Sequence, residues 1–284
     1  MPHVLTTIAE AKAVLREVGK TDTIALVPTM GALHEGHLSL VDIAKRSASK
    51  TVVSVFVNPM QFAPGEDFER YPRTFEDDLA KLDAAGVDYV FAPAVSDMYP
   101  NGIKQTRLVG GPAAGILEAA HRLAHFDGVL TVVTKLFNII RPNMAVFGEK
   151  DAQQLFLVRS LVRDLDLDID VVGAPIIREE DGLARSSRNV YLSDDERSAA
   201  LSLVRALSAA AANGDRGIRE MISQAQGALM DEKLVKMDYV SIVDPETFVL
   251  VNEAYRGTAL VLVAARVGTT RLIDNMPAYV GEYR

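Results

Sequence analysis

The chain has 284 residues, with 30 Lys or Arg against 38 Asp or Glu, and therefore a formal charge of −8 with neutral histidines. Its length and 49% hydrophobic content predict one large or two unequal globular domains and exclude disordered and fibrous classes. The acidic balance argues against a nucleic-acid-binding surface, and the absence of cysteine excludes disulfides, thiolate metal sites and thiol nucleophiles. Neither a secretory signal nor an apolar run of ~18 residues is evident, so we expect a cytoplasmic protein without a membrane partner.

Short apolar runs alternate with amphipathic stretches of helical length over the first 175 residues, a pattern typical of βαβ units. The expected strands are Ile24–Val27, Val52–Val57, Val87–Phe91, Ala145–Phe147 and Ile169–Val172. The expected helices are Leu38–Ser47, Phe75–Ala85, Gly128–Ile140 and Ala152–Leu165. The hydroxyl of Thr74 is expected to cap the second helix. The connection rule then predicts an α/β fold with a Rossmann-like, doubly wound parallel sheet.

The pattern changes after Pro175. A polar, Arg-rich loop is followed by a capping-box sequence at residues 193–196, and helices and then strands follow. The expected helices are Arg197–Ala212 and Ile218–Leu229, and the expected strands are Met237–Val243, Ala259–Ala265 and Leu272–Asp274. We therefore expect a Rossmann-like domain over residues 1–175 and a smaller α+β domain over residues 176–284.

The segment 27–39 leaves the first buried strand, turns through Gly31 and Gly36, and enters a helix. In an open α/β sheet such a junction binds ligands, and the helix N-terminus favours a phosphate. The two glycines have Walker-A spacing, but His37 and Leu38 replace the Lys and the hydroxyl residue that a P-loop requires.

His34 and His37 are three residues apart and are expected to share one helical face. Imidazoles that donate hydrogen bonds to oxyanions would serve a phosphate site, the interpretation we favour. A zinc site would need a third ligand and usually an i, i+4 spacing, and HExxH is missing. Histidines that merely begin a helix are the remaining alternative.

Two more strand ends carry polar side chains. Pro59 forces the chain off the sheet, which places Gln61 near His34, where both ends of its amide could orient a polar substrate. Lys150, with Asp151 beside it, is a candidate cation for a phosphate. Taken alone, these residues would read as an exposed loop glutamine and a solvated charged turn.

The segment 181–189 is cationic and rich in hydroxyl groups, which suits it to fold over a triphosphate, although interdomain linkers are also polar. Asp77 and Asp78 could help to hold Mg²⁺, which takes few protein carboxylates in addition to phosphate oxygens. Alternatively, these two carboxylates only complement the helix dipole.

Several longer motifs occur together in one order. They are VPTMGALHEGH (27–37), FVNPMQF (56–62), YPRT (71–74), HFDGV (125–129), FGEKD (147–151) with QQL (153–155), DGLARSSRN (181–189) and LVAARVGTTRLIDN (262–275). Their combination closely resembles the pantothenate synthetase, or pantoate–β-alanine ligase, family over essentially the whole chain. HEGH is similar to the HxGH signature of the nucleotidyltransferase superfamily, and SSRN resembles that group's KMSKS loop.

The resemblance implies a homodimeric, Mg²⁺- and ATP-dependent ligase that forms pantoyl adenylate and then transfers the pantoyl group to β-alanine. It implies catalytic roles for His34, His37, Lys150 and Arg188, with His37 as a proton donor, although we favour hydrogen bonding to phosphate as its larger role. It implies ATP contacts by Met30, Gly31, Ala32, Leu33, His34, Glu35, Gly36, His37, Gly148, Glu149, Lys150, Asp151, Ile177, Arg185, Ser186, Ser187 and Arg188. Pantoate would contact Gln61 and Gln154, β-alanine would contact Gln61, and Asp77 would reach Mg²⁺ directly or through water. Arg122 and His125 would border the site.

The chain departs from the family pattern at two places. Residues 121–125 (HRLAH) replace a version that bears proline and glycine, which alters the expectation for the local backbone. Arg185 stands where Leu, Met or Lys often precedes the two serines, so it either adds a phosphate contact or points outward.

Two other functions are considered beside the ligase. One is a nucleotidyltransferase of the same superfamily that acts on a phosphorylated acceptor, which would call for more cations than Gln61 and Gln154 supply. The other is a non-catalytic nucleotide-binding module, which is disfavoured by the intact His34, His37, Lys150 and Arg188.

Overall fold

The computed structural model describes residues 1–63, 65–102 and 106–282. The chain forms two compact units, of which the first comprises residues 1–149 and 157–175 and the second comprises residues 150–156 together with the chain from Ile176 onward. Residues 150–156, which include Lys150 and Gln154, thus belong to the second unit rather than to the first. Within the described ranges no single helix is long and apolar enough to span a membrane, although the bent pair Pro112–His121 and His125–Ile140 meets those criteria together.

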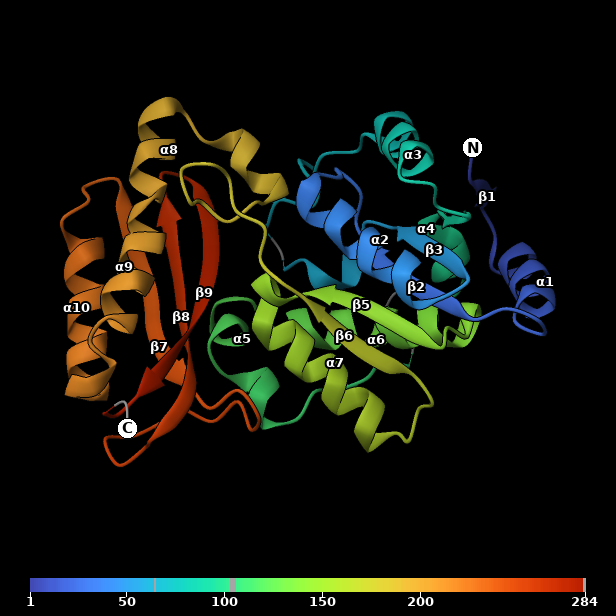
Figure 1. The fold of residues 1–284 in the computed structure, drawn as a ribbon. Helices are drawn as coiled ribbons and strands as arrows, with labels where there is room; N and C mark the ends of the chain where they lie inside the picture. The colour runs from blue at the N-terminus through green and yellow to red at the C-terminus, as the bar shows by residue number, and fades with distance from the viewer. Residues whose placement is uncertain (64, 103–105, 283–284) are drawn as a thin grey trace. The chain divides into compact units, whose positions relative to one another are not determined.

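The described part of the first unit contains a six-stranded sheet in the order β1-β4-β3-β2-β5-β6 (Figure 1). Every paired strand runs parallel to its neighbour. The strands are β1 (His3–Leu5), β2 (Ile24–Thr29), β3 (Lys50–Val55), β4 (Tyr89–Phe91), β5 (Met144–Gly148) and β6 (Asp170–Ala174). The expected doubly wound parallel sheet is confirmed.

Helices cover both faces of this sheet (Figure 1). They are α1 (Ile8–Val18), α2 (Glu35–Ser47), α3 (Phe75–Ala84), α6 (His125–Ile140) and α7 (Ala152–Asp164), with the short α4 (Val95–Met98), α5 (Glu118–His121), η1 (Pro59–Gln61), η2 (Pro112–Gly115) and η3 (Glu149–Asp151) in the connections. Side chains alternate along each strand, so Ala25 and Val27 of β2 meet Val41 and Ala44 of α2 on one face. Helices α1, α6 and α7 lie on the opposite face.

The order of the strands fixes where this sheet can hold a ligand. From β2 the chain passes through α2 to β3 in one direction, and from β5 it passes through α7 to β6 in the other. Ligands of open α/β sheets bind at such a switch point, beyond the carboxyl ends of the strands. The segments that follow Thr29 of β2 and Gly148 of β5 therefore flank the expected crevice.

The second unit packs helices on an antiparallel sheet with the order β7-β8-β9. Its elements are η4 (Ser187–Tyr191), α8 (Asp194–Ala200), α9 (Ser202–Ala211), η5 (Gly214–Arg216), α10 (Ile218–Met230), β7 (Val235–Val243), β8 (Gly257–Val267) and β9 (Thr270–Val280). The expected capping box is confirmed, because Ser193 Oγ accepts from Glu196 N and Glu196 Oε2 accepts from Ser193 N. Leu203, Leu207 and Met221 are fully buried in the core of this unit.

Three local predictions were wrong. The Thr74 hydroxyl makes no capping hydrogen bond, and only the Thr74 carbonyl accepts from the amide of Asp78. The expected helix Arg197–Ala212 is broken at Leu201, whose amide bonds to Ser198 O in a tighter turn. The expected strand Leu272–Asp274 is part of the longer β9, which runs from Thr270 to Val280. This strand can include Pro277, because it is an edge strand and one of its sides needs no N–H donors.

Candidate active site

A side chain of α3 holds the loop between β2 and α2. Gly31 and Ala32 have φ of 82° and 51°, so the chain turns sharply after Thr29. The buried carboxylate of Asp78 accepts hydrogen bonds from the amides of Ala32 at 2.9 Å and Leu33 at 2.7 Å. A Cβ on Gly31 would lie 3.0 Å from the same carboxylate, which adds to the preference for glycine at this positive φ. Asp78 therefore has a third role, distinct from metal binding and dipole compensation: it fixes the loop.

The two histidines of HEGH accept hydrogen bonds from backbone amides at the start of α2. His34 is the N-cap, and its Nδ1 accepts from Gly36 N at 3.1 Å. His37 Nδ1 accepts from His34 N at 3.3 Å, and the two ring centroids are 4.1 Å apart. Because each Nδ1 acts as an acceptor, a neutral ring carries its proton on Nε2. Both imidazoles are thereby fixed in the tautomer that presents an Nε2–H donor.

A chain of buried hydrogen bonds orients Gln61. Burial raises the pKa of Tyr99, which stays protonated and donates to Asn58 Oδ1 at 2.7 Å. Asn58 Nδ2 then donates to Gln61 Oε1 at 3.2 Å, and Gln61 Nε2 lies 2.9 Å from Met30 Sδ. Gln61 is 8% exposed, so it is not a solvated loop residue. Because Asn58 donates to the oxygen of the Gln61 side-chain amide, the NH₂ group of Gln61 is directed toward the loop that follows β2.

A close approach of backbones supports this arrangement. Gly128, in the first turn of α6, lies against the main chain of η1, and a Cβ added there would come 2.3 Å from Met60 O. Any side chain at Gly128 would push α6 away from Met60 and Gln61. The glycine of the HFDGV motif is therefore required for packing.

Arg122 and His125 surround the carbonyl of Gln61. His125 Nδ1 lies 2.7 Å from Gln61 O, and Arg122 Nη1 lies 3.0 Å from His125 Nε2. Arg122 also binds both carboxylate oxygens of Glu66 at 3.0 Å.

These contacts shift the pKa values of both partners of Arg122. Burial alone would raise the pKa of Glu66, but the hydrogen bonds and charge of Arg122 lower it below its ordinary value. Burial, and then the charge of Arg122, lower the pKa of His125 to about 4. His125 is thus neutral at physiological pH, donating through Nδ1 and accepting through Nε2. The segment has a left-handed residue before α6, since Ala124 has φ of 60°.

We expect His125 to destabilise the fold in mild acid. Its folded pKa of about 4 lies below the value of ~6.5 for an unfolded histidine, so between these limits the unfolded chain binds more protons. The contribution of neutral His125 is complete above pH 6.5 and is lost as the pH falls toward 4. Urea unfolding should show that wild type loses about 2 kcal/mol more between pH 7 and pH 5 than His125→Asn does.

His121→Asn is the control, because this neighbouring histidine is exposed. It should keep the wild-type pH dependence. Equal pH dependence of wild type and His125→Asn would contradict the assignment of a neutral, buried imidazole.

In the second unit, residues 177–185 form a hairpin rather than a plain linker. Arg185 N donates to Ile177 O at 3.0 Å, and Glu179 N donates to Leu183 O at 2.8 Å. Arg185 Nη2 pairs with Glu179 Oε2 at 3.2 Å, so its side chain folds back on the hairpin, an outcome that neither sequence alternative describes. Ser186 caps η4, which begins at Ser187 and contains Arg188.

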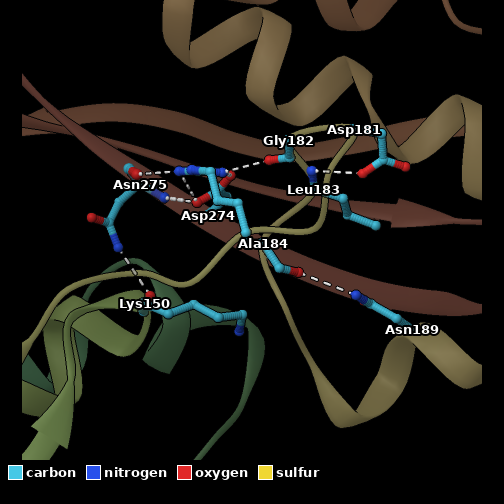
Figure 2. Close-up of polar contacts among 9 residues, drawn as sticks. Lys150, Asp181, Gly182, Leu183, Ala184, Asn189, Asp274 and Asn275 are labelled. Atoms are coloured by element: carbon cyan, nitrogen blue, oxygen red, sulfur yellow. Dashed lines mark hydrogen bonds and ion pairs between the residues drawn. The ribbon is translucent and has the colours of Figure 1, made fainter. Parts of the chain in front are cut away.

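Lys150 belongs to the same unit and is attached to its sheet. Asn275 Nδ2 on β9 donates to the carbonyl of Lys150 at 3.0 Å (Figure 2). Lys150 Nζ lies 3.9 Å from Asp151 Oδ2, an ion pair at the limit of contact. Gln154 lies one turn further along and is half-buried.

A small cavity of about 280 Å³ lies beside the β2–α2 loop in the first unit. It is lined by Met30, Gly31, Val55, Val57, Phe75 and Asp78 among others, and it is mainly apolar. Its lining does not include Gln61 but does include Met30, whose Sδ lies 2.9 Å from Gln61 Nε2, so the cavity adjoins the surroundings of that amide.

Sequence reasoning missed the residues that hold the candidate side chains. Tyr99 acts on Asn58, and Glu66 acts on Arg122, through contacts that are distant in sequence, whereas Asn58 bonds to Gln61 only three residues away. The Asn-Pro pair at 58–59 was a usable signal, because an Asn side chain before a turn commonly accepts from an amide two residues later, as it does here from Met60.

Comparison with known proteins identifies the family to which these motifs belong. The family model described as pantoate–β-alanine ligase matches residues 3–277. The chain belongs to the pantoate–β-alanine ligase family. A pantothenate synthetase of Thermobifida fusca is 50% identical, with 97% of this chain and 95% of that protein covered. One from Acidothermus cellulolyticus is 51% identical, covering 97% and 91% respectively.

Solved structures of the family agree with this fold. A pantothenate synthetase from Thermus thermophilus has a TM-score of 0.91 and 47% identity, covering 96% of this chain and 98% of that one. A pantoate–β-alanine ligase from Francisella tularensis, complexed with "Beta-gamma ATP and Beta-alanine", has a TM-score of 0.82 and 32% identity, covering 97% of each chain. The expected family, fold and enzyme class, a ligase that uses ATP, are confirmed.

Proposed function

We propose that this ligase condenses pantoate with β-alanine, consuming ATP and releasing AMP and pyrophosphate. The observation that carries the proposal is the match of the family model to residues 3–277, in a chain whose HEGH motif presents two fixed Nε2–H donors at the start of a helix. The Francisella relative, solved with an ATP compound and β-alanine, supports the same pair of substrates.

In the first step an oxygen of the pantoate carboxylate attacks the α-phosphorus of ATP. The bond from that phosphorus to the bridging oxygen breaks, and pyrophosphate leaves with the electron pair. Attack of one anion on another is slowed by repulsion, so donors and cations that bind the phosphates lower the barrier. His34, His37, Lys150 and Arg188 supply this function, and the hydroxyl groups of Ser186 and Ser187 add neutral donors.

In the second step the free amine of β-alanine attacks the carbonyl carbon of pantoyl adenylate. The carbon–oxygen bond to AMP breaks, the amide forms, and the proton of the amine passes to solvent. A mixed anhydride is reactive enough toward an amine that no covalent enzyme intermediate is required, which fits a chain without cysteine. Gln61 positions pantoate and β-alanine through its NH₂ group, since Asn58 holds the other end of its amide.

The remaining contacts are assigned by motif. ATP is bound by residues 30–37, 148–151 and 185–188 and by Ile177, and pantoate also contacts Gln154. Within residues 30–37, the amides of Ala32 and Leu33 donate to Asp78, and those of His34, Gly36 and His37 donate within the helix cap. The imidazole Nε2–H groups are therefore the donors of this segment that are best suited to a phosphate. The Nε of Arg185 is buried without an acceptor among the described residues, which leaves a donor for the nucleotide.

Magnesium enters this proposal as part of the substrate, Mg-ATP. The described residues contain no cluster of three or more His, Cys, Asp or Glu side chains able to hold a metal ion, whereas Asp77 is an exposed carboxylate beside the exposed Glu76 at the start of α3. This donor set fits Mg²⁺, which keeps several waters and binds mainly to phosphate oxygens. When bound, the ion neutralises phosphate charge, and Asp77 contributes one ligand directly or through water. A homodimer in the cytoplasm completes the proposal.

The test is product formation by the purified protein with ATP, Mg²⁺ and pantoate, with and without β-alanine. Both substrates together should give equal amounts of AMP and pantothenate. Pantoate alone should support exchange of labelled pyrophosphate into ATP. A protein that transfers AMP to a phosphorylated acceptor but forms no pantothenate would instead support the nucleotidyltransferase alternative.

A further inference from the structure

Two buried polar residues on β9, Asp274 and Asn275, end the motif LVAARVGTTRLIDN and have no role in the mechanism described above. They are 3% and 4% exposed. Polar groups this deeply buried are retained only when their hydrogen bonds are satisfied, so their partners indicate what they do.

Asp274 holds the base of the hairpin formed by residues 177–185. Its two carboxylate oxygens bind Arg178 Nη1 at 2.6 Å and Nη2 at 3.0 Å. Arg178 Nη1 also donates to Gly182 O at 3.0 Å, and the backbone of Arg178 pairs with Ala184 across the hairpin. The Asp274 carboxylate thereby fixes the segment that leads into Arg188.

Asn275 holds the other nucleotide-binding segment of the second unit. Its Nδ2 donates to the carbonyl of Lys150, 125 residues away in sequence. Its own backbone carbonyl accepts from Arg178 Nη2 at 3.3 Å, and its amide donates to Asp274 Oδ1 at 2.8 Å. Figure 2 shows Asp274 and Asn275 side by side on the strand, with Lys150 below and Gly182 above.

We propose that Asp274 and Asn275 are positioning residues for the adenylation step, which set Lys150 and the segment 177–188 on one rigid strand. The inference rests on the proposed function, because it assigns these residues to the nucleotide through Lys150 and Arg188. A loop that is hydrogen-bonded to a strand of a sheet is positioned more precisely than a loop without such an anchor. A charge displaced by about 1 Å loses much of its effect on a transition state.

The test is Asn275→Ala, because this change removes the bond to Lys150 O and leaves the Arg178–Asp274 ion pair intact. Pantoate-dependent pyrophosphate exchange should slow by about 3- to 10-fold and the KM for ATP should rise, whereas the KM for β-alanine should not change. The matched control is Asn213→Ala, which removes an equivalent bond at 2.9 Å, from Asn213 Nδ2 to Ala209 O, elsewhere in the second unit. Its exchange rate should stay at the wild-type level.

A double-mutant cycle with Lys150→Ala separates positioning from general destabilisation. If Asn275 acts through Lys150, its removal should change the exchange rate less than about 2-fold once the Lys150 side chain is absent. Asp274→Asn should slow exchange more than Asn275→Ala, since it leaves the charge of Arg178 without its bidentate partner.

The outcomes distinguish this inference from the proposed function. If the wild type is active but Asn275→Ala and Asn213→Ala have the same exchange rate, the positioning role alone is overturned. Fully additive effects of Asn275→Ala and Lys150→Ala on the exchange rate would overturn it as well. Wild type that shows neither exchange nor pantothenate formation would overturn the proposed function, and the positioning role with it.

Discussion

Replacing Lys150 with alanine is expected to slow pantoate-dependent pyrophosphate exchange by about 10²–10³-fold, the effect of removing one well-placed electrostatic donor. The side chain is only 20% exposed and its ion pair with Asp151 is 3.9 Å long, so its charge is partly desolvated and weakly compensated. A cation in this state interacts more strongly with phosphate than a fully hydrated one does. The exchange rate is measured at saturating ATP from samples quenched at a series of times.

Lys20→Ala is the matched control, because Lys20 also pairs with a carboxylate, Glu17, at 2.8 Å, but both side chains are well exposed. Exchange by this variant should equal that of wild type, and both variants should unfold near the wild-type temperature. Exchange by Lys150→Ala within about 3-fold of wild type would remove Lys150 from the mechanism.

Replacing His37 with alanine is expected to slow the same exchange by about 10²–10³-fold. The change removes a donor whose tautomer is fixed by the hydrogen bond from His34 N to His37 Nδ1. It also removes one half of the capping box of α2, which costs about 1 kcal/mol of stability and leaves the protein folded at room temperature. Thermal unfolding and exchange rates, measured on the same preparation, separate the two effects.

His3→Ala serves as the control for loss of an imidazole, since His3 is exposed on β1. Its exchange rate should match that of wild type. If His37→Ala lost stability but kept its exchange rate, His37 would be a helix cap and nothing more.

The parallel sheet could be predicted because its buried strands are continuous apolar runs such as Ile24–Val27, and because the polar loops between them carry clear turn residues. Helix α1 (Ile8–Val18) was missed although Thr7 caps its start and Gly19 follows its end. The other missed features are short or carry no local signal. Strand β1 has only three residues, and its place in the sheet comes from pairing with β4, far along the chain. The break at Leu201 interrupts a run of Ala and Leu without glycine or proline, so no local signal marks it.

The site shows a similar division. The candidate donors His34, His37 and Lys150 could be named from sequence, because strand ends and helix starts place their side chains in a known direction. The residues that hold them could not, because Asp78 and Asn275 act on backbone groups 45 and 125 positions away. Such contacts depend on tertiary packing. A carboxylate in the first turn of a helix, such as Asp78, looks the same in sequence whether it binds a metal, compensates a dipole or holds a loop.

The central claim is that pantoate is activated by attack of its own carboxylate oxygen on the α-phosphorus of ATP. The most direct measurement uses pantoate labelled with ¹⁸O in both carboxylate oxygens, together with ATP, Mg²⁺ and β-alanine, and determines by mass spectrometry where the label goes. One labelled oxygen should appear in each AMP formed and one should remain in pantothenate. Unlabelled AMP, or label in inorganic phosphate released with ADP, would contradict the adenylate mechanism.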